Sequence, residues 1–315
     1  NNERTTVDTI RTPDTQFENV VDYGFKPNYQ EINDQDGGTL RVHYLDEGPA
    51  GANPVLLLHG EPSWSYLYRH MIPILVEEGH RVIVPDLIGF GKSDKPLEQT
   101  DYSYARHVEW MRELIFDHLN LSSITFFGQD WGGLIGLRLI AQKPDRYDRV
   151  VIGNTGLPTG KGEATEAFLA WQKFSQTAPE FPIGKLINSA CIRDLTEDEI
   201  QAYDAPFPTD EYKAGARIFP SFVPTSIDDP ASQDNIAAWE VLSEYEKPFL
   251  LAFSDSDPVT KGGDAPFHAK VPGTQGQNHV TIENAGHFLQ EDKSKELATI
   301  MNDFIASTSP ERGES

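Results

Sequence analysis

The sequence predicts an α/β fold, with a doubly wound, mostly parallel sheet and a helical cap inserted after its sixth strand. Short β-branched and aromatic runs alternate with longer segments in which apolar residues recur at helical spacing. This alternation lapses between residues 157 and 230, where prolines and aromatic residues surround short helical patterns. The chain has 315 residues, 38% of them hydrophobic, and is therefore long enough to bury a large core.

Strands are expected in seven short segments that are rich in β-branched or aromatic residues and are bounded by turn residues. They are Leu40–Glu47, Pro54–Leu58, Arg81–Pro85, Ser123–Phe127, Arg149–Gly153, Phe249–Ser254 and Asn278–Ile282. Helices are expected where the apolar period is helical, over Tyr104–Leu119, Leu134–Lys143 and Lys293–Ala306. Residues 1–17 and 307–315 are expected to be frayed.

The interruption of the alternating pattern divides the chain into three parts. We expect residues 18–156 and 231–306 to form the core, and residues 157–230 to form the cap, with short helices over Glu163–Gln176 and Thr196–Tyr203. In open α/β sheets, ligands bind beside the carboxyl ends of the strands. A cap inserted there would cover the binding site.

Composition limits the partners of this protein. The formal net charge of −23 disfavours nucleic acid and anionic membranes, whereas small neutral substrates remain compatible with it. The charge suggests a salt-adapted or cold marine source, although an acidic surface that only maintains solubility would look the same. The single cysteine, Cys191, precludes an intrachain disulfide and a cysteine metal cluster.

The sequence also carries expectations about location and assembly. No apolar run reaches the length of about 18 residues that a membrane-spanning helix needs. The polar N-terminus lacks the pattern of a secretory signal, so a cytoplasmic location is expected, with a periplasmic or secreted one left open. A monomer is the expected oligomeric state.

The segment Gly128-Gln129-Asp130-Trp131-Gly132-Gly133 lies between a predicted strand and a predicted helix. Its glycines permit a tight turn, and the helix N-terminus stabilises negative charge beside it. Asp130 occupies the position at which such turns usually carry a nucleophilic serine. A carboxylate there can attack carbon and leave an ester on the enzyme. A plain glycine turn with a helix-capping aspartate is the alternative interpretation.

Three further motifs accompany this turn: His59-Gly60-Glu61-Pro62, Asp86–Asp94 and Ala285-Gly286-His287-Phe288. Together they make the chain resemble α/β-hydrolases, specifically haloalkane dehalogenases, from about Gly24 to Ile305. The chain is most similar to the subgroup typified by the dichloroethane-degrading enzyme. The resemblance implies an eight-stranded α/β-hydrolase fold. It also implies a reaction that converts a haloalkane and water into an alcohol, a halide and a proton through an alkyl–aspartate ester, without cofactor or metal.

The resemblance also implies catalytic roles for particular residues. Asp130 corresponds to the nucleophile, and His287 to the base that activates water for ester hydrolysis. Asp257 corresponds to the carboxylate that orients this histidine, with Asp255 as a close alternative. Other subgroups place the acid after the sixth strand, where this chain has Asn154.

The halide and oxyanion sites follow from the same resemblance. The indole N–H groups of Trp131 and Trp171 would bind the halide, with Trp64 as the rival for the second position. The backbone N–H groups of Glu61 and Trp131 would form the oxyanion hole, and the Glu61 side chain is a candidate for holding the hydrolytic water. His59 is expected to be structural. The expected pocket walls are Phe168, Leu134, Phe222 and Val259.

Other functions compete with this interpretation. Epoxide hydrolases share the aspartate nucleophile but protonate the epoxide with two cap tyrosines, for which Tyr203 and Tyr212 are the candidates. A serine esterase is disfavoured because Asp130 replaces the alcohol. A fluoroacetate dehalogenase would need an arginine pair just beyond the nucleophile, which is missing. A non-catalytic receptor on the same fold would have no need for the complete Asp130–His287–Asp257 set.

Overall fold

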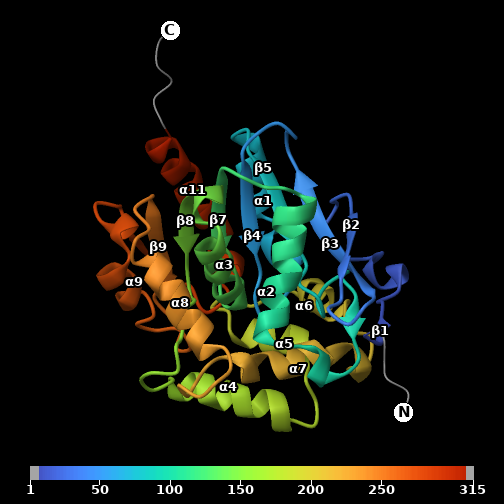
Figure 1. The fold of residues 1–315 in the computed structure, drawn as a ribbon. Coiled ribbons are helices and arrows are strands. Elements are labelled where there is room, and N and C mark those ends of the chain that lie inside the picture. The colour runs from blue at the N-terminus through green and yellow to red at the C-terminus, as the bar shows by residue number, and fades with distance from the viewer. Residues whose placement is uncertain (1–6, 310–315) are drawn as a thin grey trace.

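The computed structural model describes residues 7–309, which are built around an eight-stranded sheet (Figure 1). The strand order is β10-β9-β8-β7-β4-β5-β3-β2. Strand β3 is antiparallel to β2 and β5, and all other neighbours are parallel. The strands are β2 (Asn28–Asn33), β3 (Thr39–Glu47), β4 (Pro54–Leu58), β5 (Arg81–Pro85), β7 (Ile124–Gly128), β8 (Tyr147–Ile152), β9 (Phe249–Ser254) and β10 (Val280–Ile282). The predicted sheet type is therefore confirmed.

All seven expected strands are present in the eight-stranded sheet, and its remaining strand, β2, was not predicted. It forms the edge of the sheet by pairing with β3, and within it only Ile32 is buried. An edge strand with a single buried apolar residue lacks the hydrophobic alternation on which sequence interpretation depends. The central strands β4 and β7 are buried along their whole length, as expected of a parallel sheet covered on both faces.

Helices cover both faces of the sheet, with α2, α3 and α8 in front of it in Figure 1 and α11 behind, where α1 packs against α11. Their bounds are α1 (Met71–Glu77), α2 (Tyr104–Arg112), α3 (Trp131–Gln142), α8 (Ser232–Leu242), α9 (Ala265–Lys270), α10 (Leu289–Asp292) and α11 (Ser294–Thr308). The predicted Tyr104–Leu119 helix is α2 continued by a π-helix over Glu113–His118. Helix α3 begins three residues earlier than expected, directly after Asp130.

Four helices of the 157–230 segment lie across the carboxyl ends of the central strands, at the bottom of Figure 1. They are α4 (Glu166–Thr177), α5 (Ile183–Ser189), α6 (Glu197–Asp204) and α7 (Ala214–Ile218). The side chain of Thr165 caps α4 by accepting the N–H of Phe168. Thr196 and Glu199 form a capping box at the start of α6. These caps explain why the two helices predicted in this segment occur close to their expected positions.

A buried group of charges joins this segment to the rest of the molecule. The guanidinium of Arg69, which is fully buried, pairs with Glu199 of α6 and with Glu291 of α10. Arg193 pairs with the same two carboxylates, at 2.9 Å from Glu199 and 2.7 Å from Glu291. Removing one partner of a buried ion pair leaves an uncompensated charge and is strongly destabilising. These contacts therefore hold the segment in a defined position.

The prediction that residues 1–17 are frayed is wrong for residues 7–17. Strand β1 (Thr9–Ile10) pairs with β6 (Lys95–Pro96), and Arg11 donates to Asp94 at 2.7 Å. The partners of this segment are distant in sequence, so its local composition does not reveal them. Helix α11 likewise includes residues 307 and 308, which were expected to fray. Residues 1–6 and 310–315 lie outside the described part of the chain.

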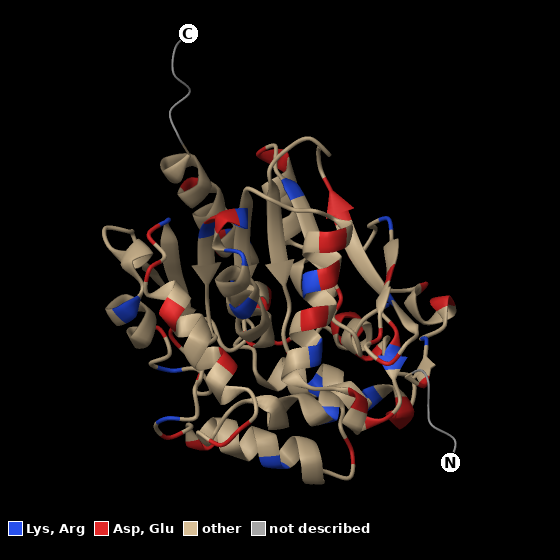
Figure 2. Cartoon of the chain, in the orientation of Figure 1, with Lys and Arg blue, Asp and Glu red and all other residues tan. Residues whose placement is uncertain are grey.

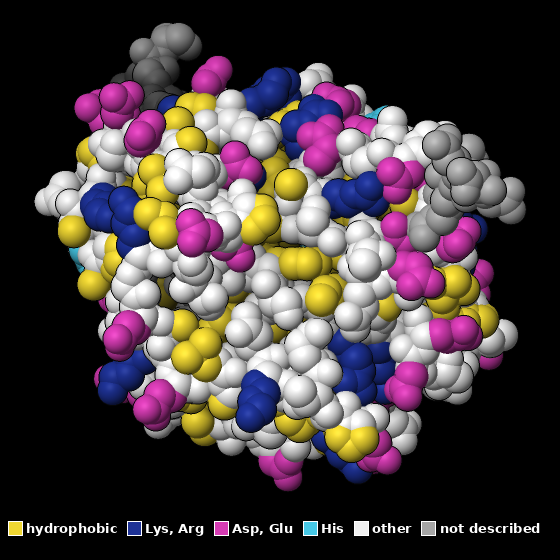
Figure 3. Space-filling model, turned by 60° about the horizontal axis from the view of Figure 1, so that its bottom comes forward, with side chains coloured by type: hydrophobic (Ala, Val, Ile, Leu, Met, Phe, Trp, Pro, Cys, Tyr) yellow, Lys and Arg dark blue, Asp and Glu magenta, His cyan; other side chains and the backbone are white. Residues whose placement is uncertain are grey.

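Charged residues lie mainly on the helices and loops around the sheet (Figure 2). On the face that comes forward in Figure 3, hydrophobic side chains gather near the middle, among scattered acidic and basic ones. Exposed large hydrophobic side chains of the 157–230 segment include Leu169, Phe174, Ile192 and Ile227. Within residues 7–309, no helix is long and apolar enough to cross a membrane.

Candidate active site

Asp130 lies in a tight turn between β7 and α3, with φ 55° and ψ −131°. Side chains other than glycine rarely adopt such a positive φ, so the surrounding contacts must hold it. A Cβ on Gly132 would lie 2.1 Å from the carbonyl oxygen of Leu58, and one on Gly128 would lie 2.7 Å from that of Gly132. The turn thus requires glycine at both positions. The Asp130 side chain forms no capping hydrogen bond with α3, which argues against the plain-cap interpretation.

The Asp130 carboxylate faces the loop after β4. The backbone N–H of Glu61 donates to its Oδ2 atom at 2.8 Å, and a Cβ on Gly60 would lie 2.5 Å from the same oxygen. The hydroxyl of Thr155 donates to the Asp130 carbonyl oxygen at 2.7 Å. The N–H of Trp131, the first residue of α3, donates to no acceptor in the described chain. The backbone N–H of Glu61 therefore holds the Asp130 carboxylate, whereas the N–H of Trp131 is without an acceptor in the described chain.

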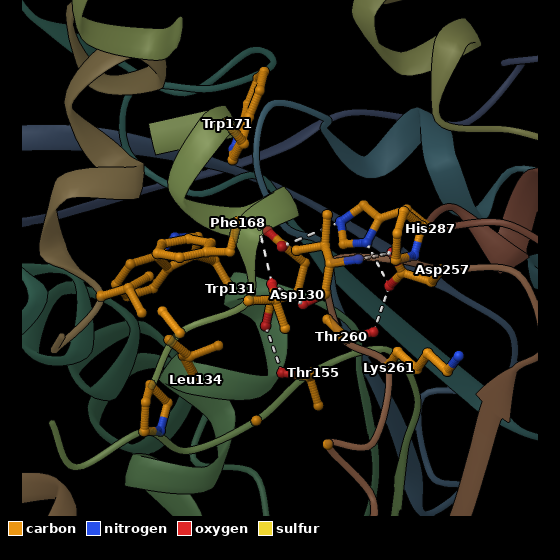
Figure 4. A pocket seen from close by; sticks show the side chains of 18 of the residues that line it. Asp130, Trp131, Leu134, Thr155, Phe168, Trp171, Asp257, Thr260, Lys261 and His287 are labelled. Atoms are coloured by element: carbon orange, nitrogen blue, oxygen red, sulfur yellow. Dashed lines mark hydrogen bonds and ion pairs between the residues drawn. The ribbon is translucent and has the colours of Figure 1, made fainter. Parts of the chain in front are cut away.

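His287 lies between the two predicted carboxylates (Figure 4). Its Nε2 atom is 3.2 Å from Asp130 Oδ1, and its Nδ1 atom is 2.8 Å from Asp257 Oδ2. The three side chains come from the ends of three different parts of the sheet: β7, the loop after β9 and the loop after β10. The structure thus brings together Asp130, His287 and Asp257.

Asp257 is held on both of its oxygens. Its Oδ1 accepts the N–H of Val259 at 3.0 Å, and its Oδ2 accepts the hydroxyl of Thr260. The neighbouring candidate Asp255 instead accepts the N–H of Asn284 at 3.0 Å and does not contact His287. Of the two aspartates, only Asp257 is therefore positioned to orient the histidine.

Asn154, which replaces an acid after the sixth strand of the sheet, has a different role here. Its amide donates to the carbonyl oxygens of Gly286 and His287, at 2.9 and 3.1 Å. Its own oxygen accepts the N–H of Ser254 at 2.9 Å. Asn154 therefore fixes the backbone of the loop that carries His287.

The two carboxylates control the protonation of His287. Burial alone would lower its pKa, but the charges and hydrogen bonds of Asp257 and Asp130 raise the pKa of His287 to about 10. In turn, although burial would raise it, the imidazolium lowers the pKa of Asp257. The histidine is thus held as a cation between two anions in the free protein.

The side chain of Glu61 is buried, and neither of its carboxylate oxygens has a hydrogen-bond partner in the described chain. Burial, and secondarily the charge of Asp130, raise the pKa of Glu61 well above its usual value. The contact of Glu61 with Asp130 is made by its main chain, as predicted from the sequence.

Two of the three candidate indoles are available to an anion. Among residues 7–309, the N–H groups of Trp131 and Trp171 have no hydrogen-bond acceptor, and both residues line the cavity above Asp130. The N–H of Trp64, by contrast, donates to the carbonyl oxygen of Ala202 at 3.1 Å. The ring of Trp131 stacks on Phe219, with centroids 4.2 Å apart. Trp64 is therefore not available as a halide donor.

A cavity of about 670 Å³ opens onto Asp130 and His287. Leu134, Phe168 and Val259 line it, as predicted. Phe222 does not line it, and this prediction is wrong, because the Phe222 ring packs edge-on against Phe219. Sequence reasoning missed several wall residues that only the folded loops bring together. They include Leu157, Leu186, Cys191, Pro220, Val223 and Trp239.

The remaining candidates lie away from the cavity. The Tyr203 hydroxyl is buried and donates to Glu291, and neither Tyr203 nor Tyr212 lines the cavity, so the tyrosine pair of an epoxide hydrolase is not formed. His59 Nε2 accepts the N–H of Leu87 at 3.0 Å, and the opposite nitrogen contacts the carbonyl oxygen of Gly60. Within the described ranges, no group of three or more His, Cys, Asp or Glu side chains could hold a metal ion.

Comparison with known families agrees with this geometry. Residues 53–294 match the family described as alpha/beta hydrolase fold. A haloalkane dehalogenase of Psychrobacter cryohalolentis is 57% identical over 94% of this chain and 97% of its own length. Another, from Mycolicibacterium paratuberculosis, is 50% identical over 92% of this chain and 95% of its own length.

Among solved structures, the tetrameric haloalkane dehalogenase DpaA of Paraglaciecola agarilytica NO2 superposes with a TM-score of 0.85. It is 36% identical, over 93% of this chain and 97% of its own. A putative ancestral haloalkane dehalogenase gives a TM-score of 0.73 at 27% identity, over 89% of this chain and 99% of its own.

Replacing Asp130 with Asn should lower the pKa of His287 towards its ordinary value near 6.5, because one of the two anions beside the ring is lost. An NMR titration of the His287 imidazole would measure this change. Asp264→Asn, which removes an exposed carboxylate 3.9 Å from His268, is the control and should leave His287 unchanged. An equal pKa in the Asp130→Asn variant and the parent would contradict the electrostatic account.

Proposed function

This chain belongs to the haloalkane dehalogenases of the α/β-hydrolase fold, and we propose that Asp130, His287 and Asp257 carry out its reaction. It is an enzyme that cleaves carbon–halogen bonds by hydrolysis. The observation that carries the proposal is the continuous contact from Asp130 through His287 to Asp257 at the base of the cavity, with the Trp131 and Trp171 indoles unpartnered above.

In the first step, Asp130 attacks the carbon that bears the halogen. We assign the attack to Oδ1, which lies 3.2 Å from His287 Nε2, because Oδ2 accepts the N–H of Glu61 and so already occupies the position in which the oxyanion must form. A carbon–oxygen bond forms as the carbon–halogen bond breaks, and the bonding electrons leave with the halide. No proton is transferred, so this step does not need His287 as a base.

In the second step, His287 removes a proton from water, and the water oxygen attacks Cγ of the ester. Esterification removes the charge of Asp130, one of the two anions that raise the pKa of His287, and this favours the neutral ring that a base requires. The oxyanion forms on Oδ2, where the N–H groups of Glu61 and Trp131 stabilise it. Cleavage of the bond between Cγ and the alkyl oxygen then releases the alcohol, whose oxygen takes a proton from the His287 imidazolium. The carboxylic acid formed at Asp130 returns its proton to His287, which restores the carboxylate. The net proton of the reaction is the one that His287 lost to solvent after Asp130 was esterified.

The leaving halide is held by the two indole N–H groups of Trp131 and Trp171. A tryptophan N–H donates but cannot accept, which suits an anion. The stacking of Trp131 on Phe219 and its edge contact with Tyr104, at 4.8 Å between centroids, support a fixed orientation of the first donor. The glutamate side chain at position 61, buried and without a partner, is available to a water molecule beside the ester.

The cavity favours substrates larger than 1,2-dichloroethane. Its volume of about 670 Å³ lies within the range of about 300–1,000 Å³ that accommodates much larger ligands. Its walls include Leu134, Leu157, Phe168 and Val223. We therefore propose medium-length bromoalkanes as substrates, in place of the dichloroethane preference that the predicted subgroup would imply.

Residues 157–230 are proposed to act as a cap over this cavity, and a single chain as the active unit. Helix α4 carries Phe168 and Trp171 into the cavity wall. The contacts from Asp130 through His287 to Asp257 are complete within one chain and need no second copy, and we propose a monomer, whereas the related DpaA is a tetramer.

Asp130→Asn should abolish halide release from 1-bromohexane, because a neutral amide does not attack carbon. His287→Gln should release one halide per enzyme in a burst and then turn over about 10²- to 10⁴-fold more slowly than the parent, because the ester is hydrolysed only slowly without a base. Halide release and the mass of the intact protein would be measured together. Exposed His268→Gln is the control. Turnover by His287→Gln near the rate of the parent would refute the proposed base.

Trp171→Phe should weaken bromide binding by about 10- to 100-fold, because a hydrogen bond to a charged group contributes about 1.5–3 kcal/mol. Product inhibition by added bromide would measure this. Trp64→Phe is the matched control, since its N–H is bound to Ala202. Equal loss of affinity in both variants would overturn the assignment of the second donor.

Catalytic efficiency should rise with chain length from bromoethane to 1-bromohexane. Each buried methylene contributes about 0.8 kcal/mol, so kcat/KM should increase by up to about fourfold per carbon while the cavity is being filled. Initial rates of halide release over the series would test this. A maximum at bromoethane would contradict the proposed substrate class and favour the dichloroethane-type preference.

A further inference from the structure

We propose that Asp292 is a positioning residue for His287, because its carboxylate ties the loop that carries the base to the connector between α5 and α6. The connector is residues 190–193, and the base loop is residues 284–287. The inference rests on the proposed role of His287 as the base for ester hydrolysis. Asp292 touches neither Asp130 nor the cavity, and neither the sequence motifs nor the reaction scheme uses it.

Asp292 is the last residue of α10, and its carboxylate accepts three backbone N–H groups. Its Oδ2 atom accepts those of Gly286 at 2.8 Å and Ile192 at 2.9 Å, and its Oδ1 atom accepts that of Arg193 at 2.8 Å. One donor belongs to the base loop and two belong to the connector. The carboxylate therefore fixes the separation of these two segments, which are distant in sequence.

The base loop also contacts the connector directly. The backbone N–H of His287 itself donates to the carbonyl oxygen of Ala190 at 3.0 Å. A Cβ on Gly286 would lie 2.5 Å from that oxygen, so a side chain between the two segments is excluded. The main chain of His287 is thus hydrogen-bonded to Ala190 at one end of the connector. Asp292 holds Ile192 and Arg193 at the other end.

The connector is in turn anchored by the buried charges. The Arg193 guanidinium pairs with Glu199 at 2.9 Å and with Glu291 at 2.7 Å, and Glu291 immediately precedes Asp292. Arg69, fully buried, pairs with both carboxylates. Asp292 thus links this buried ionic group to the base loop. Asn154 holds carbonyl oxygens of the same loop, whereas Asp292 holds the N–H of Gly286.

Loss of the Asp292 contacts should slow one of the two chemical steps, the hydrolysis of the ester. Displacement of the halide needs no proton transfer, whereas hydrolysis of the ester needs the His287 Nε2 atom aimed at a water molecule. A small displacement of the base loop should therefore slow ester hydrolysis and leave ester formation nearly unchanged. An asparagine at position 292 has one acceptor oxygen in place of two, and its amide would face an N–H donor.

The test is a single-turnover experiment on Asp292→Asn with 1-bromohexane, with bromide release and the alkyl-enzyme mass followed over time. We expect bromide release within about twofold of the parent and ester hydrolysis slowed by about 10- to 100-fold, so that the ester accumulates. Both rate constants are measured on the same folded molecules, so loss of folded protein lowers amplitudes only. If this variant does not fold, Asp292→Glu, which keeps the charge but displaces the oxygens, should show the same imbalance.

Asp34→Asn is the matched control. Asp34 also accepts three backbone N–H groups, from Val7, Asp36 and Gly38, in the turn between β2 and β3 and away from the cavity. The Asp34→Asn substitution should change the rates of bromide release and of ester hydrolysis equally, or leave both unchanged. Equal slowing of both steps in Asp292→Asn, or no ester accumulation while His287→Gln accumulates it, would overturn the inference alone. Failure of His287→Gln to accumulate ester would instead overturn the proposed function on which it rests.

Discussion

The structure depends on one backbone conformation, the positive φ of Asp130. That conformation directs the carboxylate out of the sheet, and three close approaches at Gly60, Gly128 and Gly132 leave no room for any side chain around it. Strain of this kind costs about 1–3 kcal/mol and persists only where the surroundings enforce it. Here the enforcement comes from β4, β7 and α3, which are buried along most or all of their length. The nucleophile is thus held in place by the core itself.

The other half of the site is assembled differently. His287 and Asp257 lie on loops, and their positions follow from hydrogen bonds to Asn154, Thr260 and the connector. The protonation of these groups is coupled. The carboxylates of Asp257 and Asp130 raise the pKa of His287, so neutralisation of Asp130 should lower it. A nucleophile held by the core and a base whose protonation depends on its neighbours suit two steps with different requirements, since only the second transfers a proton.

Much of this could be predicted from sequence, because the signals were local. Buried parallel strands produce continuous apolar runs, and the turn at Asp130 has a glycine pattern that its geometry requires. The order of Asp130, Asp257 and His287 along the chain was also visible. The confirmed strands, the mostly parallel sheet and the dehalogenase family all follow from such signals.

The rest depended on contacts between distant segments. Strand β1 is ordered by β6, and β2 is an edge strand with little apolar pattern. Phe222 was misplaced because the short turn that contains it points its ring at Phe219 and exposes Pro220 to the cavity. The role of Asp292 had no sequence signal, since a carboxylate that accepts backbone N–H groups resembles any surface acid until its donors are known.

The position of Cys191 has a practical consequence. It is the only cysteine of the chain and lies on the connector, in the cavity wall beside the base loop. Burial raises the pKa of its thiol, so this cysteine should react slowly with thiol reagents. The rate of chemical modification at this single sulfur atom therefore reports how easily a reagent reaches the cavity wall beside the base loop. It can be recorded on the unmodified sequence, without first removing competing thiols.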